Sequence, residues 1–436
     1  MRVAAVFVPG IMGSELVRPG GEVVWPPKVS ETIFGYNRIA ALQDPLAHAP
    51  RIISNVSCFD FYAPIQSLFG QLGYGSTGAK KLIEHPYDWR RDLFDLAEGL
   101  AQRLEEVDAD EIVIVAHSMG GLISRLVLET PTWRAKPWFG KIRSFIALAT
   151  PHNGAPLALA RVMGLDSALG IRAQDFVTLS TNPAFPSGYQ LLPAPDEDAC
   201  WDTRKDAELV PLDFYTPAVA IQLGMQPALV ARAKALHDAL RTGSLPAHVR
   251  YFYFSGAGHK TVTRVNVGPE GAHKVETPDA GDGTVPMWST LPRPVQKQVV
   301  INEHANVFRG NPFKRVFFRL LGGDAGAPTE AVAEAEFQLS VSLQKPVFLE
   351  GEPVEVVLSA ELPFATLEGR IVFQSRTEED EAIAEAASQP ITYSGPGVYS
   401  LALTMHVTLA PGLYELRFDG DRQQTERVVF AVTRKV

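Results

Sequence analysis

Short apolar runs alternate with helical patterns along the first 325 residues of the chain. The runs are of strand length, and several of them contain few polar residues, which is typical of strands buried on both faces of a parallel sheet. They occupy residues 3–8, 111–116, 142–149, 249–255 and 295–301. Between the first two runs, leucines at 93, 96, 100 and 104 recur at the spacing of one helix face. The pattern predicts an α/β fold, in which helices cover both sides of a mainly parallel sheet.

Two segments interrupt this alternation. Residues from about 157 to 247 are rich in proline and aromatic residues and contain one helical pattern, near residues 227–240. This length exceeds that of a plain connection, so we expect a cap over the functional site. A second irregular stretch, at residues 17–60, is expected to form an early flap.

The aromatic residues of the cap have two interpretations. They line a groove for an acyl chain, or they form a small core of the cap itself. The residues concerned are Phe176, Phe185, Tyr189, Trp201, Phe214 and Tyr215.

The residue pattern changes after Leu321. Residues 322–336, GGDAGAPTEAVAEAE, have the composition of a linker, and short β-rich runs separated by turn signals follow to the C-terminus. Such a series of strands is typical of a β-sandwich. We therefore expect a catalytic domain at residues 1–325, a linker at 326–336 and an immunoglobulin-like β-sandwich at 337–436.

Composition supports this division and excludes several classes of function. The chain has 436 residues, more than one hydrophobic core usually organises, so we expect two domains. Its net charge of −9 gives no basic footprint for nucleic acid. Cys58 and Cys200 are too few for a disulfide framework or a cysteine-based zinc site.

The N-terminus begins with a short apolar run that ends at Pro9 and Gly10, without the cleavage pattern of a signal peptide. No run of about 18 apolar residues occurs, so we expect no transmembrane segment. The expected location is the cytoplasm, either in solution or at the surface of a membrane.

One serine stands between a predicted strand and a predicted helix, in AHSMGG at residues 116–121. Ala116 and Gly120 lie two positions before and after Ser118, where a sharp strand-to-helix turn leaves no room for bulky side chains. The pattern predicts a nucleophile elbow, with alanine in place of the first glycine of GxSxG. A serine that only caps the helix is the alternative for this motif taken alone.

A catalytic serine needs a base and an orienting carboxylate, which in this fold follow in the order Ser, Asp, His. Asp282 in GDGTVP and His304 in EHANV follow in that order, each just past a predicted strand. A tight turn is the alternative for GDGTVP. His259 and His273 are rivals to His304, but both precede Asp282 and so violate the order.

An acyl-transfer site also needs donors for the oxyanion. The backbone N–H of Met119, directly after the serine, is the first candidate. The second is the N–H of Ile11, because Gly10 before it lets the backbone approach the substrate. A plain Pro-Gly turn at the end of the strand is the alternative.

Six motifs occur together along the first 310 residues: VFVPGIMGSEL, FYAPIQSLFGQLGY, HPYDWRRD, AHSMGG, GDGTVP and EHANV. They resemble the lecithin:cholesterol acyltransferase family of α/β hydrolases, which includes lysosomal phospholipase A2 and plant phospholipid:diacylglycerol acyltransferases. The resemblance implies that Ser118, Asp282 and His304 form the catalytic triad and that Ile11 and Met119 form the oxyanion pair. It also implies a substrate-binding segment at Tyr87, Asp88, Trp89 and Arg90.

Two features depart from the family pattern. Secreted members carry a disulfide in the early lid, where this chain has only Cys58. ATPHNGAP, at residues 149–156, is more similar to bacterial lipases. The resemblance does not extend to the C-terminal β-rich segment.

These features predict a serine ester hydrolase or O-acyltransferase, of phospholipase A or lipase type, that works through an acyl-enzyme without a metal or an organic cofactor. The expected substrate is a lipid ester at a membrane surface or in a micelle. Two alternatives remain, a catalytically silent hydrolase fold that serves as a binding module and a general carboxylesterase. The C-terminal domain is expected to provide a surface for a protein partner.

Overall fold

A computed structural model describes residues 1–28, 31–32, 35–56, 59–204, 210–323, 339–343, 347–377, 382–420, 423–425 and 427–434. The chain divides into two compact units. Unit 1 comprises Met1–Pro26, Tyr36–Ile53 and Ile65–Val307, and unit 2 comprises Pro27–Gly35, Ser54–Pro64 and Phe308–Val436. The predicted linker at 326–336 and Cys58 lie outside the described residues.

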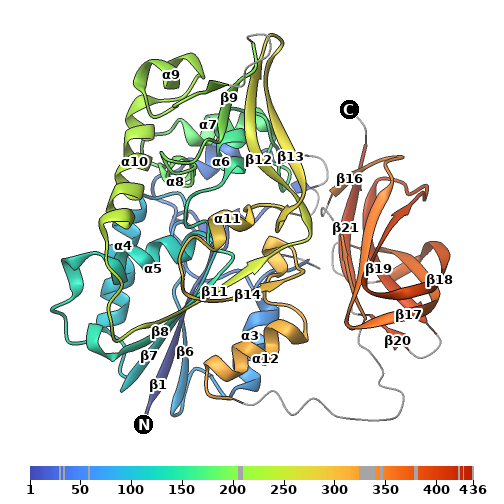
Figure 1. Ribbon diagram of the computed structural model, residues 1–436, viewed down its shortest axis with the longest axis horizontal. Helices are drawn as coiled ribbons and strands as arrows, with labels where there is room; N and C mark the ends of the chain where they lie inside the picture. Colours follow the sequence, from blue (N-terminus) through green and yellow to red (C-terminus); the bar gives the residue numbers. More distant parts are fainter. Residues whose placement is uncertain are drawn as a thin grey trace. The chain divides into compact units, whose positions relative to one another are not determined.

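A six-stranded parallel sheet forms the centre of unit 1 (Figure 1). Its order is β14-β11-β8-β7-β1-β6. The strands are β1 (Val3–Val8), β6 (Lys80–Glu84), β7 (Glu111–His117), β8 (Ile142–Leu148), β11 (Arg250–Gly256) and β14 (Gln296–Val300). The inner strands are almost fully buried, which explains why they read as continuous apolar runs. The predicted α/β fold with a mainly parallel sheet is confirmed.

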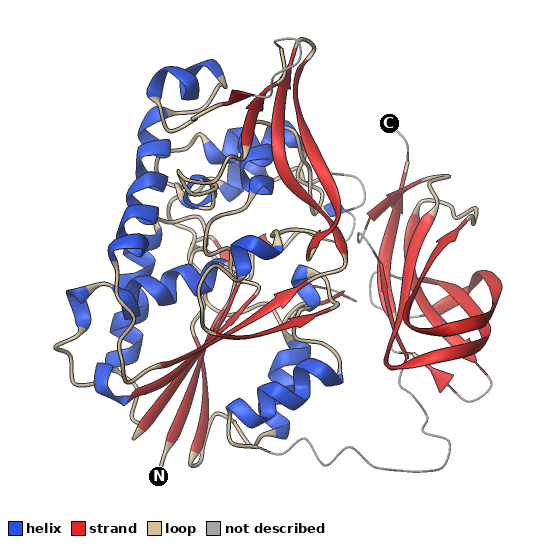
Figure 2. Ribbon diagram, in the orientation of Figure 1, coloured by secondary structure: helices blue, strands red, loops and turns tan. Residues whose placement is uncertain are grey.

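Helices cover both faces of this sheet (Figure 2). On one side lie α4 (Leu93–Glu105) and α5 (Met119–Glu129), and on the other lies α3 (Ala63–Gln71). The Asp92 side chain caps α4 by accepting a hydrogen bond from the Phe94 N–H. The helix buries the leucines that the sequence placed on one face. α5 is buried along its whole length because it lies between the sheet and other helices.

A second sheet, which the sequence did not predict, precedes Asp282. Its order is β10-β9-β12-β13. The strands are β9 (Cys200–Asp202), β10 (Val210–Pro211), β12 (His259–Gly268) and β13 (Gly271–Gly281). β12 and β13 form a long antiparallel hairpin between β11 and Asp282. The hairpin extends the connection that carries the candidate acid.

The cap is a set of helices with its own core. The helices are α6 (Pro156–Val162), α7 (Ala173–Ser180), α8 (Ser187–Gln190), α9 (Pro217–Gln222) and α10 (Pro227–Thr242). Tyr189 and Phe214 are buried in that core, and Tyr215 packs against it. Phe185 lies under the Arg90 guanidinium, whose Cζ atom is 4.2 Å from the centroid of the Phe185 ring. For Tyr189, Phe214 and Tyr215 the structure has the second of the two predicted arrangements, a core of the cap itself.

Short elements complete unit 1. They are β2 (Leu16–Val17), β3 (Val23–Trp25), α2 (Ile39–Leu42), the 3-10 helices η1 (Pro131–Trp133), η2 (Phe139–Lys141) and η3 (His304–Asn306), and α11 (Met287–Thr290). β3 and α2 lie within the predicted early flap, and β2 begins one residue before it. No helix among the described residues is long and apolar enough to cross a membrane.

Unit 2 contains a separate, curled and mostly antiparallel β domain (Figure 2). It comprises β15 (Leu339–Leu343), β16 (Val347–Leu349), β17 (Val354–Arg376), β18 (Ala382–Met405), β19 (Gly412–Gly420), β20 (Gln423–Gln424) and β21 (Val428–Thr433), and unit 2 also holds β4 (Asn55–Val56), β5 (Phe59–Asp60) and α12 (Asn311–Leu320). With 23 residues, β17 is longer than the short β-rich runs that the sequence predicts for this domain.

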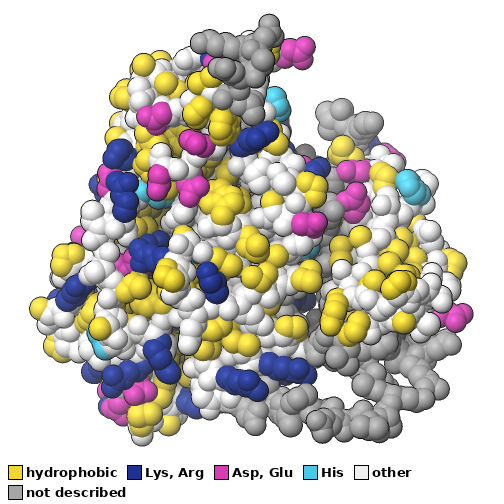
Figure 3. All heavy atoms as spheres, in the orientation of Figure 1, with side chains coloured by type: hydrophobic (Ala, Val, Ile, Leu, Met, Phe, Trp, Pro, Cys, Tyr) yellow, Lys and Arg dark blue, Asp and Glu magenta, His cyan; other side chains and the backbone are white. Residues whose placement is uncertain are grey.

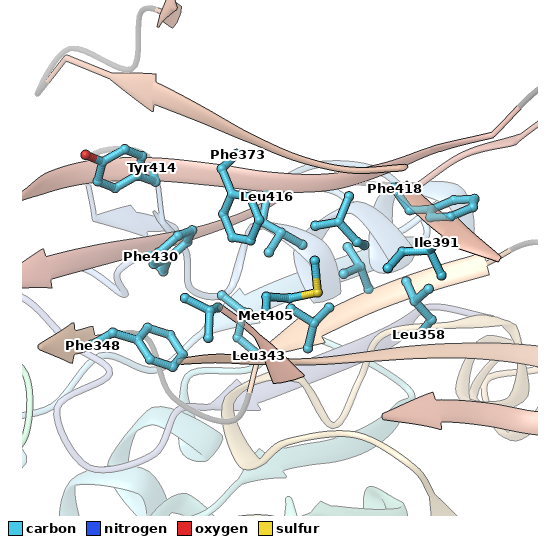
Figure 4. Close-up of a cluster of buried hydrophobic side chains, with 14 of the residues drawn as sticks. Leu343, Phe348, Leu358, Phe373, Ile391, Met405, Tyr414, Leu416, Phe418 and Phe430 are labelled. Carbon is cyan, nitrogen blue, oxygen red and sulfur yellow. The ribbon is translucent and has the colours of Figure 1, made fainter. Parts of the chain in front are cut away.

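The curled sheet encloses one hydrophobic core. Side chains from its opposite walls, such as Phe373, Leu416, Leu358 and Met405, point toward one another (Figure 4). Successive side chains of a strand point to opposite faces, so one face of each strand contributes to this core. An immunoglobulin-like topology stays a prediction.

Candidate active site

Ser118 occupies a strained turn between β7 and α5. Its backbone has φ 52° and ψ −125°, an unfavourable region for a residue with a side chain. Strain of this kind is expected at a nucleophile elbow, where it exposes the serine oxygen at the end of the sheet. α5 begins at the next residue, so its N-terminal backbone dipoles lie beside the Ser118 oxygen.

The elbow also explains the glycine two residues later. A Cβ atom on Gly120 would lie 2.3 Å from the Pro9 carbonyl oxygen and 2.6 Å from that of Val8. Both contacts are with backbone, which cannot move aside without displacing β1. The first turn of α5 can therefore pass the end of β1 only with glycine at this position.

We expect Gly120→Ala to lower the free energy of unfolding by about 1–3 kcal/mol, the usual cost of overpacking a core. Gly99 is a matched control within α4, because a Cβ atom there would meet nothing within 4 Å. Gly99→Ala should stabilise the helix by up to about 1 kcal/mol. Urea unfolding of both variants tests this, and equal stabilities would contradict the packing argument.

Three side chains form a continuous hydrogen-bonded line. His304 Nε2 lies 2.8 Å from Ser118 Oγ, and His304 Nδ1 lies 2.8 Å from Asp282 Oδ2. A carboxylate can only accept, so the ring nitrogen facing Asp282 carries the proton and Nε2 is left to accept from the serine hydroxyl. Asp282 is buried, whereas 14% of the His304 side chain is exposed.

The carboxylate of Asp282 is fixed by its own turn. Its Oδ1 accepts hydrogen bonds from the backbone N–H groups of Thr284 (3.0 Å) and Val285 (2.7 Å). The GDGTVP motif is thus a tight turn that also carries the candidate acid, so the two interpretations of it are compatible. Oδ2 remains directed at His304.

The rival histidines lie elsewhere. His259, at the start of β12, is joined to Asp282 by a backbone bridge, and burial lowers the pKa of its ring. His273 lies in β13, where it pairs with Asn266 of β12. His304 is the histidine whose ring lies between Ser118 and Asp282.

The candidate oxyanion donors lie on two neighbouring segments. Met119 is the first residue of α5 and is fully buried. Ile11 lies in a turn that the Gly13 N–H closes onto the Gly10 carbonyl at 3.1 Å. Met12, the next residue, has a positive φ of 62°.

The segment at Tyr87 and Trp89 braces this turn. The Tyr87 hydroxyl donates to the Pro9 carbonyl at 2.6 Å, and Trp89 Nε1 donates to the Ser14 carbonyl at 3.2 Å. Trp25 of the early flap donates to the carbonyl of Met12 at 2.8 Å. Bonds on both sides of Ile11 thus hold the loop that carries it.

Asp88 and Arg90 extend the brace to the flap. Arg90 donates to both Asp88 oxygens at 2.7 Å and to the carbonyl oxygens of Leu42 and Asp44. Tyr87, Trp89 and Arg90 are each no more than 5% exposed. The segment therefore connects the oxyanion loop, the flap and the cap, and a direct contact with substrate stays a prediction.

Within the described ranges, no group of three or more His, Cys, Asp or Glu side chains is arranged to hold a metal ion.

Comparison with known proteins finds a family model that matches part of the chain and a solved structure with a similar fold. The family model for lecithin:cholesterol acyltransferase matches residues 57–210, which confirms the resemblance over that range. The matched range contains Ser118 and the segment at residues 87–90 but neither Asp282 nor His304. An uncharacterized protein of Saccharomyces cerevisiae is 28% identical over 158 residues, which are 35% of this chain and 22% of that protein. The chain thus spans about a fifth of that relative's length.

A similar solved structure is a chain in the crystal structure of the Tle4-Tli4 complex. It has a TM-score of 0.55, is 12% identical, and the match covers 72% of this chain and 96% of that chain. At this identity the similarity shows the fold alone.

Proposed function

We propose that this chain, whose residues 57–210 match the lecithin:cholesterol acyltransferase family, is a serine ester hydrolase or O-acyltransferase that acts on lipid esters. The observation that carries the proposal is the line of hydrogen bonds from Ser118 through His304 to Asp282. A serine that only capped a helix would need neither the strained backbone nor an imidazole on its hydroxyl.

In this mechanism Ser118 Oγ attacks the ester carbonyl carbon while His304 Nε2 takes the hydroxyl proton. Asp282 holds the ring orientation and stabilises the imidazolium that forms. The N–H groups of Met119 and Ile11 would donate to the oxyanion of the tetrahedral intermediate. His304 then protonates the leaving alcohol, and an acyl-enzyme remains on Ser118. Water or a second alcohol, deprotonated by His304, releases the acyl group.

Exposed apolar side chains near the candidate acid and base support a lipid substrate. Met287 and Trp288, shortly after Asp282 in the chain, are each 38% exposed, and Ile301, shortly before His304, is 51% exposed. Hydrophobic side chains are numerous on the face that carries α11 (Figure 3). Because Tyr189, Phe214 and Tyr215 of the cap pack in its own core, we place the acyl chain against these exposed residues instead.

The first experiment is labelling with a fluorophosphonate probe, which reacts with activated serines. We expect stoichiometric labelling of the parent protein and none of Ser118→Ala. A folded parent protein that is not labelled would favour a catalytically silent binding module.

Substrate class is tested by a series of esters from acetyl to long-chain acyl groups. Each buried methylene should improve transition-state binding by up to about 0.8 kcal/mol until the apolar surface is filled. We therefore expect kcat/KM to rise with chain length and phospholipid micelles to be cleaved better than short soluble esters. A preference for acetyl or butyryl esters would instead indicate a general carboxylesterase.

Mass spectrometry with an added alcohol separates hydrolysis, which gives free fatty acid, from transfer, which gives a new ester.

A further inference from the structure

The backbone of His304 is held at both of its peptide groups. Its N–H donates to the Asp282 carbonyl oxygen at 2.9 Å. Its carbonyl oxygen lies 3.0 Å from Nε2 of His117, the residue directly before Ser118. The candidate base is therefore tied on one side to the acid and on the other to the strand that carries the nucleophile.

The ring of His117 has a defined protonation state in this contact. A carbonyl oxygen can only accept, so His117 Nε2 must carry a proton and donate it. Burial, and to a smaller extent the neighbouring His304, lower the pKa of His117 to about 3. The ring is thus neutral at ordinary working pH, and it donates without adding a positive charge beside His304.

The neutral state matters because the two rings are close. Their centroids lie 5.0 Å apart, and His117 is only 6% exposed. During turnover His304 becomes an imidazolium, which a second positive charge at this distance would oppose. A neutral donor fixes the backbone of His304 and leaves its ring free to accept the proton of Ser118.

We propose that His117 is a positioning residue, which aligns the His304 imidazole between Ser118 and Asp282 by holding the His304 carbonyl. The inference rests on the proposed function. His304 is the first residue of the short 3-10 helix η3, so the main hydrogen-bond ladder of the sheet does not fix it. A misplacement of about 1 Å in a reacting group costs on the order of 100-fold in rate.

The test compares two substitutions of similar size. His117→Leu removes the donor, whereas His117→Gln places an amide N–H where His117 has Nε2. We expect His117→Leu to lower kcat on a short soluble ester by roughly 10- to 100-fold with little change in KM. His117→Gln should recover most of that loss, and fluorophosphonate labelling rates should follow the same order.

A matched control exists in the cap. His237 is also 6% exposed, and its Nε2 lies 2.8 Å from the Leu192 carbonyl oxygen. His237→Leu and His237→Gln should change the unfolding temperature but leave kcat near that of the parent. If His117→Leu does not fold, His117→Asn replaces it, because its shorter amide cannot reach the His304 carbonyl.

The outcomes separate this inference from the proposed function. A parent that is active and labelled at Ser118, with a His117→Leu variant of equal kcat, would overturn the positioning role alone. Equal losses of kcat in His117→Leu and His117→Gln would also overturn it, because rescue by the donor is the distinguishing result. A parent that neither turns over esters nor reacts with the probe would overturn the proposed function itself.

Discussion

Replacing Ser118 or His304 with alanine is expected to lower ester turnover by at least about three orders of magnitude. Ser118 Oγ and His304 Nε2 are 2.8 Å apart, so each is ineffective without the other. The double variant should therefore be no slower than either single variant. Both single variants should keep the parent unfolding temperature. A loss of only a few-fold in either one would mean that another residue is the nucleophile or the base.

The acid has a built-in control on the same connection. Asp282→Asn keeps an oxygen for the N–H groups of Thr284 and Val285 but turns an amide N–H toward His304, which favours the wrong ring tautomer. We expect a severe loss of kcat. Asp279 is exposed on β13, so Asp279→Asn should lower kcat only slightly. The reverse ranking would reassign the acid.

Buried elements were predictable because burial marks the sequence. Strands covered on both faces read as apolar runs, and β1, β7, β8 and β11 lie where those runs are. The edge strand β14 also coincides with a predicted run, although it is mostly exposed. The edge strand β6, KKLIE, was missed because it is half-exposed and charged. The hairpin of β12 and β13 was missed for a similar reason, since β13 is largely exposed or half-buried.

The candidate site was partly predictable from local motifs and chain order. These selected Ser118, Asp282 and His304, and the structure brings their side chains together, while their catalytic roles stay predictions. The direction in which a side chain points in the folded protein cannot be predicted from local motifs in this way. The ring of His117, directly before Ser118, reaches a carbonyl 187 positions away in the chain, and no motif indicates this contact.

The cap illustrates the same limit. Composition located an aromatic-rich insertion but could not distinguish a groove lining from a small core. Both arrangements need large apolar side chains, and only the packing partners of Tyr189 and Phe214 separate them.

A buried ion-pair network lies farther along the helix that begins at the elbow. Arg125 donates to both oxygens of Glu129, at 3.0 and 3.1 Å, and the two side chains are 3% and 0% exposed. Arg293 reaches the same carboxylate at 3.0 Å. Arg125 also donates to the carbonyl of His152, whose N–H donates to Ser289 in α11. Glu129 therefore neutralises cations that connect α5 to the loops around the site.

Glu129→Gln is expected to lower the free energy of unfolding by about 3–5 kcal/mol, because it leaves the Arg125 guanidinium buried without its anion. Urea unfolding at neutral pH measures the loss. Glu106→Gln is the matched control. Glu106 pairs with Arg103 at 3.1 Å at the surface, where the two side chains are 68% and 45% exposed. The change in stability caused by Glu106→Gln should therefore be too small to resolve. The double variant Arg125→Met, Glu129→Leu should regain much of the stability, because an apolar pair of similar volume leaves neither charge buried alone. A Glu129→Gln protein as stable as the parent would show that water reaches Arg125 and that the network does not hold the helix.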